Sequence, residues 1–441
     1  MATNSIPAQH GVSLRREPLT GAYVWLLLFM VVYCARPEDW IPGLMVVPLA
    51  KITGILALIA LLLTMGGIRQ RFPREIIYLI LLMLQLFLTV PFSPVWRGGA
   101  FESSLDFSKV VPIVIVMVLA VNSLKRLRRL VFIQCASVAV IAGVTVWRGR
   151  VLSGRLEGVL NGNYANPNDL AFAIVLSLPL CLVLAFVARN KFSKVLWAVV
   201  MAVMAYAVFL TASRGGFVCF IVATAICLWE FSIRGRRRYL IPVVALAGIA
   251  LWAYAGGGVS GRFNSTLHSN SIEVEDGAYS SAQGRWDLFT QSLKVTARHP
   301  LFGVGTGNFE IVSGNWHATH NAFTQMSSEG GVPALLLFVM ILWCSFQNIN
   351  ATKRKGPGRE PDLWARGFRA SLGAFIVGSF FASEAYQFFT YFLVGYTTVL
   401  GRIASSEREI RKLAAQESSA ALAEPKAARQ ELERDILWSP N

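Results

Sequence analysis

The chain has 441 residues, of which 54% are hydrophobic and 15% charged, and its formal net charge is +16 at pH 7. Soluble domains carry about 25% charged residues, so this composition excludes an ordinary soluble protein and is typical of an integral membrane protein. In a soluble protein so high a positive charge would suggest a nucleic-acid partner. In a membrane protein, the loops that hold the basic residues decide what the charge means.

Apolar stretches long enough to cross a bilayer recur along the chain, separated by short loops. They predict an all-α, polytopic integral membrane protein with about twelve transmembrane helices. The predicted spans are 20–35, 43–65, 75–91, 109–122, 130–147, 168–188, 195–212, 215–233, 239–256, 331–348, 367–383 and 386–402. The expected parts are N-terminal transmembrane helices at 1–159, a central domain at 160–345, C-terminal transmembrane helices at 346–402 and a tail at 403–441 that is a loose helix or a disordered extension.

Lysine and arginine gather in every second loop, for example at 125–129, 234–238 and 353–369, and in the tail. The positive-inside rule therefore places these loops and both termini in the cytoplasm, and the central loop at 257–330 in the periplasm of a bacterial inner membrane. Because the basic charge sets the topology, the expected partner is the lipid bilayer and not a nucleic acid. The first span ends VVYCARP without a small-x-small cleavage site, so we expect an uncleaved helix.

All six cysteines lie in the apolar spans, and none lies in the large periplasmic loop. Neither a disulfide framework nor a zinc spacing is present. We expect no metal and no cofactor.

The periplasmic loop begins its ordered part with QGRWDLFTQSLKVTARHP, residues 283–300. Its apolar residues at helical spacing predict a short amphipathic helix lying along the membrane surface; they are Trp286, Phe289, Leu293 and Ala297. GVGTGN at 303–308 follows no strand and lacks a third glycine at the spacing of a dinucleotide-binding loop, so we interpret it as a turn.

The positive-inside rule disfavours cations on the outer side, and two of the arginines predicted there are candidates for binding an anion. Arg214 lies in the turn TASRGGF, 211–217, where glycines and a helix N-terminus could help it hold a phosphate. Arg285 begins the amphipathic helix, and a second guanidinium could complete a clamp for a diphosphate. The alternative is that both are ordinary interfacial anchors.

His317 and His320 stand in HATHNAF, 317–323, just before an apolar span. A metal site would need a third ligand from elsewhere in the loop and matches no known zinc pattern. His320 followed by Asn321 suits a general base, since imidazole titrates near neutral pH, although a helix-capping histidine is the alternative.

NGNYANPND, 161–169, collects asparagines and Asp169 ahead of another span. These side chains could bind sugar hydroxyls, or Asn168 and Asp169 could cap the helix. We take Asn168 and Asn321 as candidate substrate-binding residues.

One reaction suits Arg214, Arg285 and His320 on the same outer face. In transfer of a glycan from a polyprenyl diphosphate, arginines stabilise the leaving group while a base takes the proton of the attacking hydroxyl.

At this point the chain resembles the O-antigen ligase and polymerase superfamily, whose ligase-related domain would cover 160–345. The matching pieces, in order, are NPNDLAFAIVLSLPL, FLTASRGGFVCFIVA, GRWDLFTQSLKVTARHPLFGVGTGNF and HNAFTQMSSEGGVPALLLF. The resemblance implies a metal-independent, inverting glycosyltransferase of the membrane-embedded C-type class that takes an undecaprenyl-diphosphate-linked glycan. By motif, Arg214 and Arg285 match the diphosphate-binding arginines, and His320 matches the catalytic histidine.

The acceptor stays open at this stage. Ligases of the superfamily attach the glycan to lipid A core, polymerases extend it on another lipid-linked repeat, and related enzymes glycosylate protein side chains. Outside the superfamily, a flippase or other secondary transporter and a noncatalytic scaffold are alternatives. A transporter would show similar halves and a polar site at mid-membrane, whereas here the halves differ and charge within the spans is almost limited to Lys51.

Overall fold

The computed structural model describes the chain except for residues 1–18, 42, 66–71, 150, 153–154, 157–163, 165, 268–281, 315–316, 353–358 and 438–441. The described part is almost entirely helical, as predicted. Its only strands are the two-residue β1 (Val151–Leu152) and β2 (Arg155–Leu156), which pair antiparallel.

Helices cover nearly every predicted span. In the first half they are α1 (Thr20–Ala35), α2 (Pro37–Trp40), the 3-10 turn η1 (Leu44–Val46), α3 (Leu49–Thr64), α4 (Arg74–Phe92), α5 (Arg97–Ser108), α6 (Val110–Ala120), α7 (Leu124–Arg148) and α8 (Pro167–Val187). In the second half they are α9 (Lys191–Leu210), α10 (Arg214–Cys227), the π-helical turn η2 (Leu228–Ile233), α11 (Leu240–Leu267), α12 (Ala282–Arg298), α13 (Phe309–Val312), α14 (Ala322–Thr352), α15 (Glu360–Gly378) and α16 (Phe388–Leu437).

Within the described residues, eight helical stretches are long and apolar enough to cross a membrane, and α1 and α3 are shorter apolar helices. The chain is therefore an all-α, multi-pass membrane protein, while the exact number of spans stays a prediction. One such stretch joins α5 to α6, so the helix before 109–122 was missed from the sequence. The tail is helical as far as Leu437.

The core is built around α8, which packs against α7, α9, α10 and α15. This helix is apolar on all sides, as expected for a helix surrounded by others. Its few polar contacts are paired: Gln134 of α7 donates to Ser177 Oγ at 3.4 Å and accepts from Tyr396 Oη at 2.6 Å. The six cysteines are free thiols in α1, α7, α8, α10 and α14.

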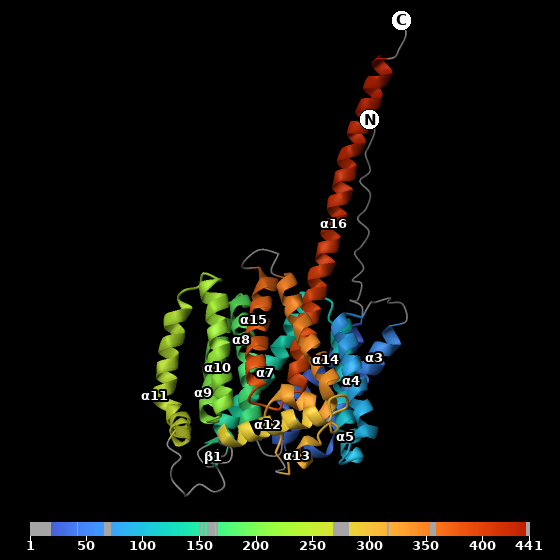
Figure 1. The fold of residues 1–441 in the computed structure, drawn as a ribbon. Coiled ribbons are helices and arrows are strands. Elements are labelled where there is room, and N and C mark those ends of the chain that lie inside the picture. Colours follow the sequence, from blue (N-terminus) through green and yellow to red (C-terminus); the bar gives the residue numbers. More distant parts are fainter. Residues whose placement is uncertain are drawn as a thin grey trace.

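The two ends of the bundle differ. Figure 1 shows α12, α13 and β1 lying across one end, while α16 extends far beyond the opposite end. The residues predicted to react and the predicted cytoplasmic tail are therefore separated by the thickness of the bundle.

A break in α14 separates the site from the span that follows. Gly331 has φ 78° and ψ 173°, and Pro333 follows two residues later. A side chain at Gly331 would place its Cβ 2.4 Å from Leu301 O, so only glycine fits. The residues of α14 before the break pack against the loop that contains α12 and α13. The predicted span at 331–348 begins at the break itself.

Candidate active site

The glycine-rich segment after α12 is a turn that packs against α14. Val304 N donates to Ser328 O at 2.9 Å, and Gly305 N donates to Glu329 O at 3.0 Å. Gly303 has φ 62°, and a Cβ there would lie 2.4 Å from the backbone of Glu329. The glycines thus allow two backbones to meet, which confirms the turn and gives no support to a nucleotide site.

Helix α12 lies across the bundle end as predicted and stops at Arg298. The predicted apolar stripe does not face the protein, since Trp286 is 61% and Leu293 46% exposed. A second apolar stripe on α12, formed by Leu288 and Val295, does face the protein. It forms a small buried cluster with Val304 and Phe309. The helix therefore has one face for the protein and another that remains available to lipid.

His320 occupies a fixed turn at the start of α14. Its φ of 51° is left-handed, which is uncommon for a residue with a side chain. On its two sides, Thr319 Oγ1 donates to Asn321 O at 3.0 Å, and Asn321 Oδ1 accepts from Phe323 N at 2.9 Å and Thr324 N at 3.1 Å. Capping of the helix and the threonine contact hold the backbone on both sides of His320 in one conformation.

The electrostatic surroundings of His320 include Arg285, which was predicted to act in the same reaction. Burial, then the positive charge of Arg285, then His317 lower the pKa of His320 from 6.5 to about 4. Arg285 and His320 therefore lie near enough for their charges to interact, although α13 and the glycine turn separate them in sequence. At neutral pH the imidazole is uncharged, so a ring nitrogen carries the lone pair that a base needs.

Arg214 is the first residue of α10. Ser213 caps this helix, since its Oγ accepts from Gly216 N at 3.1 Å, and the same hydroxyl donates to Asn168 Oδ1 at 2.7 Å. A Cβ at Gly216 would lie 2.6 Å from Ala171 Cβ, so the glycine lets α10 approach α8 closely. The start of α10 is thus fastened to the start of α8.

The last loop, residues 379–387, was missed from the sequence. Its letters SFFASEAYQ read as apolar, so the predicted span 367–383 continued into it, whereas α15 ends at Gly378. Ala322 N donates to Ser379 O at 2.7 Å, and Thr319 and Ser383 place their hydroxyls 3.3 Å apart. The last loop therefore packs directly on the histidine turn.

The same loop also reaches α10 and α8. A Cβ at Gly215, next to Arg214, would lie 3.1 Å from Phe381 Cβ. Glu384 shares a hydrogen bond with Asp169 in the first turn of α8. The turn of His320 and the start of α10 are therefore joined through the last loop.

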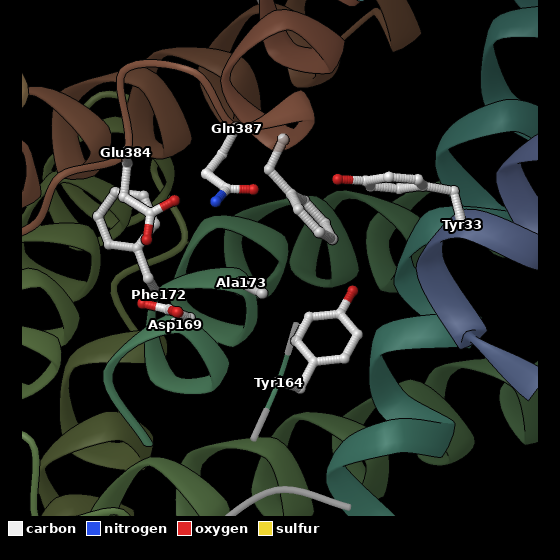
Figure 2. Close-up of a pocket in the computed structure, with 8 residues that line it drawn as sticks. Tyr33, Tyr164, Asp169, Phe172, Ala173, Glu384 and Gln387 are labelled. Carbon is white, nitrogen blue, oxygen red and sulfur yellow. The ribbon is translucent and has the colours of Figure 1, made fainter. Parts of the chain in front are cut away.

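A small pocket lies beside this junction (Figure 2). Its lining comes from α1, the segment before α8, α8 itself, the last loop and α16, and comprises Tyr33, Tyr164, Asp169, Phe172, Ala173, Glu384, Gln387 and Phe389. Burial, with the neighbouring Asp169 carboxylate as the next cause, raises the pKa of Glu384 well above its ordinary value.

The two asparagines predicted to bind substrate have structural contacts. Asn321 is 4% exposed and caps α14, and Asn168 accepts from Ser213. The expectation that Asn168 or Asp169 caps α8 is wrong: the cap is Asn166, whose Oδ1 accepts from Asn168 N at 2.9 Å, because Pro167 takes the first helical position.

Within the described residues, His, Cys, Asp and Glu side chains form no group of three or more that could hold a metal ion. His317 is exposed at the surface beside His320.

Comparison with known proteins gives one family. Residues 199–339 match the family model described as Wzy_C, O-antigen ligase, whose members are glycosyltransferase-like enzymes. No curated protein matches the chain. A chain from a solved structure titled "Structural coordination of polymerization and crosslinking by a peptidoglycan synthase complex" is similar at 15% identity and a TM-score of 0.42, covering 75% of this chain and 97% of its own length, a likeness too low to carry an inference. The matched residues begin within α9 and end within α14, so they include Arg214, Arg285 and His320. The protein is a multi-pass membrane protein whose residues 199–339 are similar to the O-antigen ligase family.

Proposed function

We propose that the protein transfers a glycan from an undecaprenyl-diphosphate carrier to an acceptor hydroxyl on the periplasmic side of a bacterial inner membrane. The family match supports chemistry of the ligase or polymerase type. The observation that carries the proposal is that the positive charge of Arg285 acts on a half-buried His320, whose low pKa leaves it uncharged at neutral pH. A cation near a base suits a reaction that releases a diphosphate and removes a proton.

Arg214 and Arg285 bind the diphosphate of the donor, and His320 accepts the proton of the acceptor hydroxyl. As the proton leaves, the acceptor oxygen attacks the anomeric carbon, and the bond from that carbon to the diphosphate oxygen breaks. Undecaprenyl diphosphate departs with the electron pair, whose charge the two guanidinium groups stabilise. A single displacement of this kind inverts the anomeric centre and needs no metal ion.

Donor binding strengthens the base. The charge of Arg285 contributes to the low pKa of His320. A bound diphosphate offsets that charge and so raises the pKa of the imidazole toward its ordinary value. His320 therefore holds a proton more readily when the donor is in place than when the site is empty.

The proposed orientation puts α12, α13 and the histidine turn in the periplasm and α16 in the cytoplasm, with residues 160–345 as the catalytic domain. The opposite placement of α12 and the end of α16 in Figure 1 is consistent with this orientation. Both protein ends are then cytoplasmic, in agreement with the basic loops.

The test uses purified protein with undecaprenyl-diphosphate-linked glycan, EDTA, and three acceptors: lipid A core, a second lipid-linked repeat and a protein. We expect one acceptor to be glycosylated in chelator, and His320→Ala to lose transfer while still binding the donor. His299→Ala, a histidine just beyond the far end of α12, is the matched control and should keep full activity. Transfer by His320→Ala at the wild-type rate would overturn the mechanism and favour a transport or scaffold role.

A further inference from the structure

The last loop holds the histidine turn by two contacts. Ala322 N, at the start of α14, donates to Ser379 O at 2.7 Å. The hydroxyls of Thr319 and Ser383 lie 3.3 Å apart. Because these two contacts flank the proposed base in sequence, a shift of the last loop would move the base with it.

The same loop is joined to α8 by a pair of carboxyl groups. Glu384, in the loop, shares a hydrogen bond with Asp169 in the first turn of α8. Figure 2 shows the carboxyl group of Glu384 directed toward that of Asp169. The backbone behind Glu384 is also held, since its carbonyl oxygen accepts from Gln387 N at 3.3 Å and from Thr390 Oγ1 at 3.2 Å. A fixed turn therefore presents the Glu384 carboxyl group to α8.

Asp169 belongs to the attachment between α8 and α10. It follows Asn168, whose Oδ1 accepts from Ser213 Oγ at 2.7 Å, and Ser213 caps the helix that begins at Arg214. The carboxyl pair thus completes a series of contacts that runs from the start of α10 through α8 and the last loop to the histidine turn. In the proposed reaction, this series sets the distance between the diphosphate and the base.

The contact between the two carboxyl groups depends on one shared proton. Two carboxylates repel each other, whereas a carboxylic acid can donate to a neighbouring carboxylate. Glu384 is 7% exposed, and burial, with Asp169 as the next cause, raises its pKa well above the ordinary value. The other titratable side chains near the pair are Tyr33 and Tyr164, which line the same pocket, and Cys219 of α10, on which the charge of Glu384 acts. None of these three can carry a positive charge in place of the proton.

The cavity beside the carboxyl pair is too small to hydrate two charges. Its volume of about 20 Å³ has room for one or two water molecules. Loss of the shared proton would therefore leave two carboxylates in contact with little water to screen them. Separation of the last loop from α8 would relieve this repulsion.

Building on the proposed function, we propose that Asp169 and Glu384 are positioning residues, whose shared proton holds the last loop on α8 and thereby fixes the start of α10 relative to His320. The carboxyl pair keeps the loop in place at neutral pH and releases it at alkaline pH, when the shared proton is lost. Neither carboxyl group takes part in the proton transfer of the reaction itself.

The first test needs no substrate and measures Tm of the full chain in detergent against pH. A pair whose pKa is raised by folding stabilises the protein while it holds its proton, and this stabilisation is lost as pH rises through the raised pKa. The Tm of the wild type should therefore fall at alkaline pH. Glu384→Gln keeps an N–H donor for Asp169 and cannot ionise, so its Tm should fall less over the same range. Glu102→Gln, an exposed glutamate on α5, is the matched control and should follow the wild type.

The second test measures transfer by the same variants. Glu384→Ala removes the hydrogen bond to Asp169 and should lower kcat by about 10- to 100-fold, because the base is displaced from the donor. Its donor KM should stay close to that of the wild type, since both proposed diphosphate-binding arginines remain. Glu384→Gln should restore most of kcat and should lack the fall in kcat that the wild type shows at alkaline pH.

Equal losses of kcat in Glu384→Ala and Glu384→Gln would overturn the proposal, as would the same alkaline fall in Tm or kcat for wild type and Glu384→Gln. Asp169→Asn, the reciprocal conservative change, should behave as Glu384→Gln does, so the comparison does not depend on the folding of Glu384→Ala. The Tm measurements do not require transfer. A wild type that transfers no glycan would therefore contradict the proposed function, while the Tm curves would still show whether the carboxyl pair shares a proton.

Discussion

At the residue scale, His320 combines a left-handed backbone with a depressed pKa. Left-handed residues with a side chain cost about 1–2 kcal/mol and persist where the surroundings impose them. Here the Asn321 cap and the Thr319 hydroxyl impose the conformation. Ala212, two residues before Arg214, has a φ of 47°, so both proposed reaction segments contain such a residue.

The pH dependence of transfer follows from the charge of Arg285. A base works only when deprotonated, so on the acid side kcat/KM of the wild type should fall only as pH drops through the low pKa of His320, about 4. Arg285→Ala removes a cause of that low pKa, raises it, and should move the acid limb to higher pH in addition to weakening donor binding. The measurement is kcat/KM against pH for wild type, Arg285→Ala and, as control, Arg298→Ala at the other end of α12. An acid limb that stays in place in Arg285→Ala would show that its charge does not act on the base.

At the element scale, the segment between α12 and α13 is fastened to α4 and α5. Gln85 of α4 donates to Leu301 O at 2.8 Å and to Gly330 O at 2.9 Å. Ser104 of α5 lies 3.1 Å from the hydroxyl of Thr306. Helices α4 and α5 precede the matched residues 199–339 in sequence. Their hydrogen bonds nevertheless hold α12 and the glycine turn in place at the end of the bundle.

Asn308 is the central residue of this attachment. Its Nδ2 donates to Ser93 Oγ at 2.8 Å, Trp96 O at 2.9 Å and Val304 O at 3.1 Å, and the side chain is buried. Asn308→Ala removes three buried hydrogen bonds, while Val304 O still accepts from Ser93 Oγ and Trp96 O from Ala100 N. We therefore expect a loss of about 1–3 kcal/mol in the free energy of unfolding, together with slower transfer. Thermal unfolding in detergent measures the first effect. Asn350→Ala, an exposed asparagine on α14, is the control, and equal stability losses in the two variants would refute the assigned role.

At the scale of the whole molecule, the bundle was predictable where local sequence carries the signal. A bilayer-crossing helix needs about 20 apolar residues, so most spans could be found by hydropathy. The last loop could not, because the apolar residues of SFFASEAYQ continue those of α15 in sequence, while its backbone leaves that helix and packs against the histidine turn. The pairing of Asp169 with Glu384 likewise has no local signal, since it exists only after α8 and the last loop have met.

The orientation of the whole molecule is the remaining prediction, and the native cysteines make it testable. Five of the six are buried and Cys227 is half-buried, so a thiol reagent that cannot cross membranes should label the wild type weakly. Lys294→Cys places an exposed thiol at a polar position of α12, and Glu409→Cys places one on the projecting part of α16. In intact spheroplasts we expect the reagent to label Lys294→Cys and to label Glu409→Cys only after the membrane is opened. The reverse pattern would put the histidine turn in the cytoplasm, away from any periplasmic acceptor, and labelling of both before opening would show that the two ends of the bundle do not lie on opposite sides of the membrane.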